Sequence, residues 1–224
     1  MNEGTSSLKS LEYDDQKTML GARIGFSNGL DSSNISLSAL KKNLRSSIEL
    51  WADVVRNPGF RPEDIERDRA LTLANLENAK MSPESIAQNL LSTVLYGPDH
   101  VYSGKTILEK EEAVKSITLS DLENFHQTWI RPDNAKIYIV GDTKIEEIKE
   151  ELNRAFGDWQ NPDREKGIKA LTDADNIDKT RIILVDRPGA VQSIIQAAHL
   201  VSPSTDKNAF NINAMNSILG GEFT

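Results

Sequence analysis

Apolar residues recur at helical spacing in several parts of the chain, and the clearest stripe lies in its first quarter. Leu40, Leu44, Ile48, Trp51 and Val55 follow one another at intervals of three or four positions. This spacing places them on one face of a helix, so the segment is predicted to be an amphipathic helix that buries this face. The Asn-Pro-Gly sequence that follows predicts where the helix ends.

Similar patterns predict six further helices. Residue types at their ends support them, because Ser82 suits an N-cap, Pro62 suits a first helical turn and Gly21 suits a C-cap. The predicted helices span 10–20, 60–80, 82–95, 118–130, 144–156 and 206–219. The apolar residues available for packing are Leu11, Met19 and Leu20 in the first of these and Ile145, Ile148, Leu152 and Phe156 in the fifth.

Other apolar runs predict strands. Ala22–Ser27 and Asn34–Leu40 flank the turn-rich sequence Asn-Gly-Leu-Asp-Ser-Ser, so we expect them to pair as a hairpin. Ala135–Val140, Arg181–Val185 and Val191–Leu200 are more continuously apolar, which is typical of buried strands. Strands and helices are mixed without strict alternation, and this order favours an α+β fold with helices packed on a mixed or antiparallel sheet.

Composition narrows the choice of partners. The chain has 224 residues and a formal net charge of -8, which is unfavourable for binding a phosphate backbone, so nucleic acid is not expected as a partner. Cysteine is absent, which excludes disulfides and thiolate metal sites. No apolar run approaches the roughly 20 residues that span a bilayer. The first 15 residues have no apolar core, so they are not a signal peptide.

Local motifs for catalysis are missing from the chain. The histidines, His100, His126 and His199, are not spaced to share a helix face, so neither H-E-x-x-H nor H-x-x-E-H occurs. A nucleophile elbow is also absent, and Gly220-Gly221 follows a predicted helix, whereas phosphate-binding loops precede one. We therefore assign no catalytic or metal-ligating residue, and each histidine is interpreted as structural.

Peptide binding by strand addition is compatible with the predicted hairpin. An exposed edge at Ala22–Ser27 would accept an extended peptide through backbone hydrogen bonds. The alternative is that another part of the protein covers this edge.

An ordered set of segments resembles the pitrilysin/insulinase family of inverzincin metallopeptidases, which includes mitochondrial processing peptidase. The matching segments are Gly4-Thr5, Leu20-Gly21-Ala22, FRPEDIERDR, LYGPDH, ITLSDLENF, RPDNAKIYIVGD, AFGDWQNP, VDRPGAVQSIIQAAH and NSILGGEFT. The resemblance covers nearly the whole chain in the family's order. It implies a first peptidase-family domain over 1–160 that lacks its N-terminal part, a linker over 161–178, and the start of a second, truncated domain over 179–224.

The resemblance also locates the family's zinc ligands. In catalytic members, the helix with H-x-x-E-H leads into a segment ending in Gly-Thr, so the motif is expected just upstream of Met1. The third ligand in the family is a glutamate that falls at or beside Asn75 when Glu66-Arg67 or Asp68-Arg69 is aligned. Glu77 lies two positions further on, and two positions turn a helical side chain by about 200°. Glu77 replaces Asn75 only if an insertion shifts the register.

Three hypotheses follow from the resemblance. The first is a non-catalytic module that binds peptide and helps to close a chamber, together with a catalytic module in the same parent chain or in a second subunit. The second is a fragment of an active zinc metalloendopeptidase with Glu77 as the distal ligand, and the third is a structural core subunit of an assembly. We expect no cofactor and no peptidase activity in this chain alone, with zinc confined to the catalytic module.

A binding site and a location are implied in the same way. In the family, the strand matching Ala22–Ser27 borders the cleft and pairs with extended substrate, so Ile24, Gly25, Phe26 and Ser27 are the expected peptide-binding residues. The sequence does not identify the cellular compartment. For a bacterial parent protein, the location considered is the periplasm or the cell envelope, and any signal peptide is expected upstream of Met1.

Overall fold

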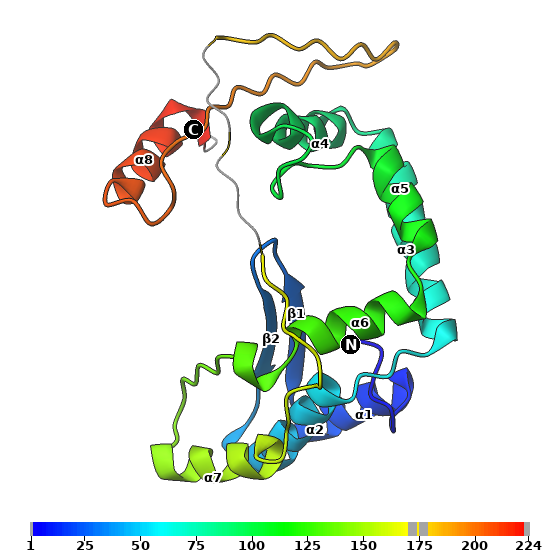
Figure 1. The fold of residues 1–224 in the computed structure, drawn as a ribbon, viewed down its shortest axis with the longest axis vertical. Coiled ribbons are helices and arrows are strands. Elements are labelled where there is room, and N and C mark those ends of the chain that lie inside the picture. Colours follow the sequence, from blue (N-terminus) through cyan, green and yellow to red (C-terminus); the bar gives the residue numbers. More distant parts are fainter. Residues whose placement is uncertain (1, 170–173, 175–178, 222–224) are drawn as a thin grey trace. The chain divides into compact units, whose positions relative to one another are not determined.

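The computed structural model describes residues 2–169, 174 and 179–221 (Figure 1). The chain divides into two compact units. The first comprises residues 1–78 and 108–170, and the second comprises residues 79–107 and 171–224.

The first unit begins with a helix that leads into a β-hairpin. Helix α1 (Ser10–Leu20) ends at Gly21, whose φ of 62° is left-handed and therefore favours glycine. Strands β1 (Arg23–Asn28) and β2 (Ser33–Ser38) then pair in antiparallel register, with Ile24 opposite Leu37. The helix and the hairpin predicted from the sequence are both confirmed.

Helix α2 (Leu44–Arg56) forms the centre of the first unit. It follows a 3-10 turn at Lys41–Asn43, and its two apolar sides supply two core clusters. One cluster contains Tyr13, Ile24, Leu50 and Val54. The other contains Ile48 and Ala52 together with Ile148 and Ala155 from α7 (Ile145–Phe156). Burial of these side chains is the main force that holds α1, α2, α7 and the hairpin together.

The remaining helices of the first unit are α3 (Pro62–Lys80, which belongs to this unit as far as Asn78), α5 (Ile107–Ser116) and α6 (Leu119–Trp129). The start of α6 is capped, because the Thr118 hydroxyl accepts a hydrogen bond from the Asp121 amide and the Asp121 carboxylate accepts one from the Thr118 amide. A short 3-10 turn, η2, follows at Pro132–Asn134. Helix α5 was not among the helices predicted from the sequence.

Helices α4 and α8 lie in the second unit, counting only the residues that the structure describes. Helix α4 (Pro83–Tyr96) begins as predicted, with the Ser82 hydroxyl accepting a hydrogen bond from the Ser85 amide at 3.1 Å. Helix α8 (Ala209–Asn216) continues into a π-helical turn, η3, at Ser217–Gly221. The last residue of α4 and the loop that follows it form a cluster of rings, in which Tyr96 and His100 stack with centroids 4.9 Å apart. Helix α8 is shorter than the predicted 206–219.

Three predicted strands are absent from the part of the chain that the structure describes. Residues 135–140, 181–185 and 191–200 form no strand, and their apolar side chains are largely exposed, with Val140 and Val191 fully so. An apolar run favours an extended backbone, but a strand's hydrogen bonds must come from a neighbouring strand. The described residues place no such neighbour beside these segments, and for this reason the prediction was wrong.

Burial also differs from the pattern in two helices. Leu11 and Met19 of α1 are about four-fifths exposed, at 80% and 79%, whereas Tyr13 is fully buried. In α7, Ile145 is exposed while Ile148, Leu152 and Phe156 pack in the core. Composition alone did not indicate which of several apolar positions would meet a neighbouring element.

The mixed helix and strand content agrees with the predicted α+β fold, with helices and a small antiparallel sheet. Most of the predicted linker, 161–178, lies outside the described residues beyond position 169. The proposed division into two domains at that linker therefore stays a prediction. No helix among the described residues is long and apolar enough to cross a membrane.

Candidate peptide-binding site

The four predicted peptide-binding residues lie together on β1. Ile24, Gly25, Phe26 and Ser27 are successive residues of the strand, and their backbone on one edge pairs with β2. Within the described residues, no strand pairs with the other edge of β1. The amide and carbonyl groups on that edge have the spacing with which a sheet accepts a further strand.

The two faces of β1 differ in character. Ile24 is buried and joins the core cluster around Tyr13, and half-buried Phe26 packs against the same cluster. Gly25 and Ser27 alternate with them and are exposed. Successive side chains of a strand point to opposite faces, so the strand is anchored by one face and leaves a small, polar outer face.

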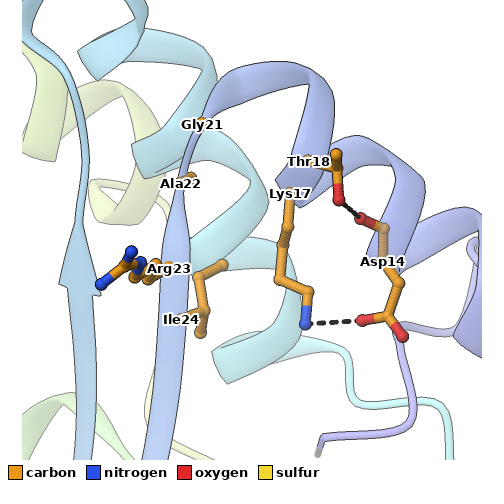
Figure 2. A pocket seen from close by; sticks show the side chains of 7 residues that line it. All are labelled: Asp14, Lys17, Thr18, Gly21, Ala22, Arg23 and Ile24. Carbon is orange, nitrogen blue, oxygen red and sulfur yellow. Dashed lines mark hydrogen bonds and ion pairs between the residues drawn. The ribbon is translucent and has the colours of Figure 1, made fainter.

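An open pocket of about 640 Å³ adjoins the start of β1 (Figure 2). Figure 2 shows Lys17 and Asp14 of α1 on one side of β1 and strand β2 on the other. The pocket is lined by Asp14, Lys17, Thr18, Gly21, Ala22, Arg23 and Ile24. A peptide strand added to the unpaired edge of β1 would therefore pass this pocket.

The charged side chains of α1 in this pocket neutralise each other. Lys17 Nζ lies 2.6 Å from Asp14 Oδ1 and 4.6 Å from the centroid of the Tyr13 ring. Only 19% of the Lys17 side chain is exposed, so its ammonium group is held by the carboxylate and the ring face. This pair was not predicted from the sequence, although Asp14 and Lys17 are three positions apart and so face the same way on a helix.

Tyr13, beneath the pocket pair, is the largest fully buried side chain of the first core cluster. Its hydroxyl has no hydrogen-bond partner among the described residues. Burial, followed by the nearby Asp14 carboxylate, raises the pKa of Tyr13 above its usual value, so the phenol stays protonated at neutral pH. Tyr13 thus contributes apolar area to the core. No hydrogen bond among the described residues offsets the cost of burying its hydroxyl.

The start of α3 holds the N-terminal segment through arginine contacts. The Arg61 guanidinium donates to the carbonyl oxygens of Thr5 at 2.5 Å and Leu8 at 3.0 Å. Arg67 forms ion pairs with Glu3 and with the buried carboxylate of Asp64. These contacts fix the segment that leads into α1 and hence the position of the helix beside β1. They were not predicted, because backbone carbonyl acceptors carry no sequence signal.

The two residues considered for the third zinc ligand are a neutral amide and a carboxylate. Asn75 and Glu77 of α3 are both exposed. Across the described residues, no three histidine, aspartate or glutamate side chains are arranged to hold a metal ion. An amide is a weak zinc ligand beside imidazole and carboxylate.

The histidines occupy different surroundings. His126 of α6 is half-buried, and its Nε2 lies 2.7 Å from the Val55 carbonyl oxygen. His100 accepts a hydrogen bond at Nδ1 from the Tyr102 amide at 3.0 Å, and His199 is exposed. Both observed bonds are to the backbone, which is consistent with the structural role expected for His100 and His126.

Comparison with known proteins shows which families the chain is similar to. Residues 1–104 match the family "Insulinase (Peptidase family M16)", and residues 116–224 match "Peptidase M16 inactive domain". Human mitochondrial-processing peptidase subunit beta is 22% identical over 156 residues, which cover 70% of this chain and 32% of that protein. Zinc protease PqqE of Helicobacter pylori is 20% identical over 220 residues, covering 97% of this chain and 49% of that protein.

Solved structures show the same fold. A peptidase M16 inactive domain from Pseudomonas fluorescens superposes with a TM-score of 0.67 at 23% identity, covering 78% of this chain and 42% of that one. The periplasmic protease PqqL from Escherichia coli has a TM-score of 0.63 at 14% identity, covering 78% of this chain and 20% of that one. This chain spans from about a third to about half the length of the curated relatives above. With both halves matched in order by M16 domains, the chain belongs to the insulinase, or M16, family of peptidases.

Proposed function

We propose that this chain is a non-catalytic module of an M16 peptidase. It binds an extended peptide along the unpaired edge of β1 and helps to close a chamber around it. Its partner is a catalytic module, in the same parent chain or in a second subunit. For a bacterial parent, we propose a periplasmic or cell-envelope location, in keeping with the periplasmic relative PqqL.

The unpaired edge of β1 is the observation that carries the proposal. The strand is anchored by Ile24 and Phe26, so its backbone is held in place before a peptide arrives. A strand of six residues, at about 3.3 Å per residue, would pair with a peptide segment of about the same length. Binding through the backbone is tolerant of peptide sequence, as expected of a module that takes many peptides.

The proposed lack of catalysis rests on α3. The position where the family resemblance requires a glutamate ligand is filled by Asn75, whose amide is neutral. The match of residues 116–224 to an M16 domain described as inactive is compatible with this assignment. A module without zinc ligands would contribute to hydrolysis only by holding the substrate for its partner.

A fragment of an active zinc peptidase is the alternative. Its support is the similarity to a protein named a zinc protease, which covers 97% of this chain. In this alternative, Glu77 supplies the distal ligand in the parent protein. Measuring the zinc content of the parent protein distinguishes the non-catalytic module from the active peptidase. The variant Glu77→Gln is compared with the control Glu66→Gln on the same helix. Stoichiometric zinc that is lost only in Glu77→Gln would refute the non-catalytic module.

Hydrogen exchange tests peptide binding at β1. We expect an extended peptide with a free backbone to slow exchange of β1 amides, because its strand would bond to them. The same peptide with alternate amides N-methylated is the control, since it keeps the side chains but loses backbone donors. Binding of both peptides with equal affinity, or binding without protection of β1, would reject the strand-addition site.

A further inference from the structure

We infer that Arg23 selects an acidic side chain in the bound peptide, at the position directly across from it in the added strand. The inference rests on the proposed strand addition at β1 and names the preferred substrate of that site. Arg23 lies at the start of β1, beside the open pocket. It would be a specificity-determining residue, since its charge acts on a peptide side chain and not on the peptide backbone.

Arg23 is the single charged residue in the sequences of β1 and β2. It is exposed, and within the described part of the chain it makes no ion pair or side-chain hydrogen bond. Its partner across the hairpin is Ser38, which is neutral. A charge with no counter-ion on an otherwise neutral surface favours an approaching group of opposite sign.

Two other charged side chains near the hairpin are already paired within the chain. Lys17 is held by Asp14, and Asp31 in the hairpin turn pairs with Lys169. Figure 2 shows the Arg23 side chain directed away from Lys17 and Ile24, toward the side of β1 on which β2 lies. Arg23 is thus an exposed cation at the start of β1 that has no counter-ion among the described residues.

The outer face has room for this contact. Gly25 and Ser27 follow Arg23 on the same face and are small, so neither side chain covers the cross-strand position. Opposite charges directly across two strands attract, whereas like charges repel. The attraction is exposed to solvent, and we expect it to change affinity by up to about fivefold.

Three peptides that differ at one position test the inference on the full chain. They carry Glu, Gln or Lys across from Arg23 in an otherwise neutral, extended sequence, with the position found by scanning the charge along the peptide. The wild type should bind the Glu peptide best and the Lys peptide worst, and Arg23→Glu should reverse that order. Arg23→Gln should remove the preference. The preference should also weaken in high salt, because the pair is exposed.

Lys149→Glu on α7 is the matched control, since it makes the same change in net charge at an exposed residue away from β1. It should leave the order of the three peptides unchanged. Equal preference for Glu in the wild type and in Arg23→Glu would overturn the role of Arg23 and leave strand addition standing. Failure of all three peptides to bind the wild type would remove the proposed function and this inference together.

Discussion

His126 and Val55 are joined by a side-chain contact that spans 71 residues of the chain. Nε2 of His126 lies 2.7 Å from the carbonyl oxygen of Val55, near the C-terminal end of α2. The His126 ring also meets Phe60 edge to face, with centroids 5.9 Å apart. One half-buried histidine thus connects α6 to the end of α2 and to the segment that leads into α3.

The first prediction concerns this histidine and pH. Burial lowers the pKa of His126 below 6.5, although its hydrogen bond to Val55 acts in the opposite direction. The unfolded chain therefore binds the proton more readily. The stabilisation linked to neutral His126 is therefore fully present above pH 6.5. It is lost as pH falls through the lower folded-state pKa of this histidine. Urea unfolding of wild type and His126→Gln should show a shallower loss in the variant on acidification. Equal slopes in both would contradict the prediction.

The second prediction concerns the buried hydroxyl of Tyr13. Tyr13→Phe removes a hydroxyl that has no partner among the described residues, so we expect the free energy of unfolding to stay unchanged or to rise slightly. Tyr13→Ala leaves a cavity and should cost about 3–5 kcal/mol. Urea unfolding measures both variants. A loss above about 1 kcal/mol in Tyr13→Phe would indicate a hydrogen bond that the structure does not contain.

The third prediction concerns the Arg61 contacts with the N-terminal segment. Arg61→Met should remove the Arg61 donor to the Thr5 carbonyl and one of the two donors to the Leu8 carbonyl, which keeps the Thr5 amide, at a cost of about 1–3 kcal/mol. Amides of residues 4–9 should exchange faster with solvent, because the segment would open locally. Arg154→Met on α7 is the control, since its ion pairs with Glu150 and Glu151 are more exposed and should be worth under about 1 kcal/mol. Equal effects of the two variants would rule out a special role for Arg61.

The fourth prediction concerns the cap of α6. Hydrogen bonds from the Thr118 hydroxyl and amide lower the pKa of Asp121 below 3.8. This stabilisation is present above pH 3.8 and is lost as pH falls through the lower folded-state pKa. Thr118→Val keeps the shape of the side chain but removes the hydroxyl. NMR titration should show a higher Asp121 pKa in Thr118→Val, and an unchanged pKa would mean that the cap does not form in solution.

Local sequence was a good guide where a structural element depends on its own residues. The N-cap Ser82 and the C-cap Gly21 lie at the ends of observed helices, and the hairpin forms around the predicted turn. Such features depend on side-chain to backbone contacts within a few positions. The strand that carries the candidate site could therefore be located from its own residues and the turn that follows them.

Other features depended on segments distant in the sequence. The apolar run at 135–140 reads as a buried strand, yet it lacks a neighbouring strand among the described residues. The pocket beside β1 requires α1 to lie along the strand, and that placement depends on Tyr13 and on the Arg61 contacts. No periodic pattern in the sequence records which side of a helix will meet another element.

The sequence by itself determined the family, the positions of most helices, the hairpin and the neutral Asn75 where a ligand was expected. These follow from residue types and short-range spacing. Only the tertiary structure decided that Tyr13 is buried while Leu11 is exposed, that the outer edge of β1 lies beside a pocket, and that Arg23 has no counter-ion among the described residues. The physical reason is that burial and pairing are properties of two surfaces in contact, and a sequence specifies each surface without showing which ones meet.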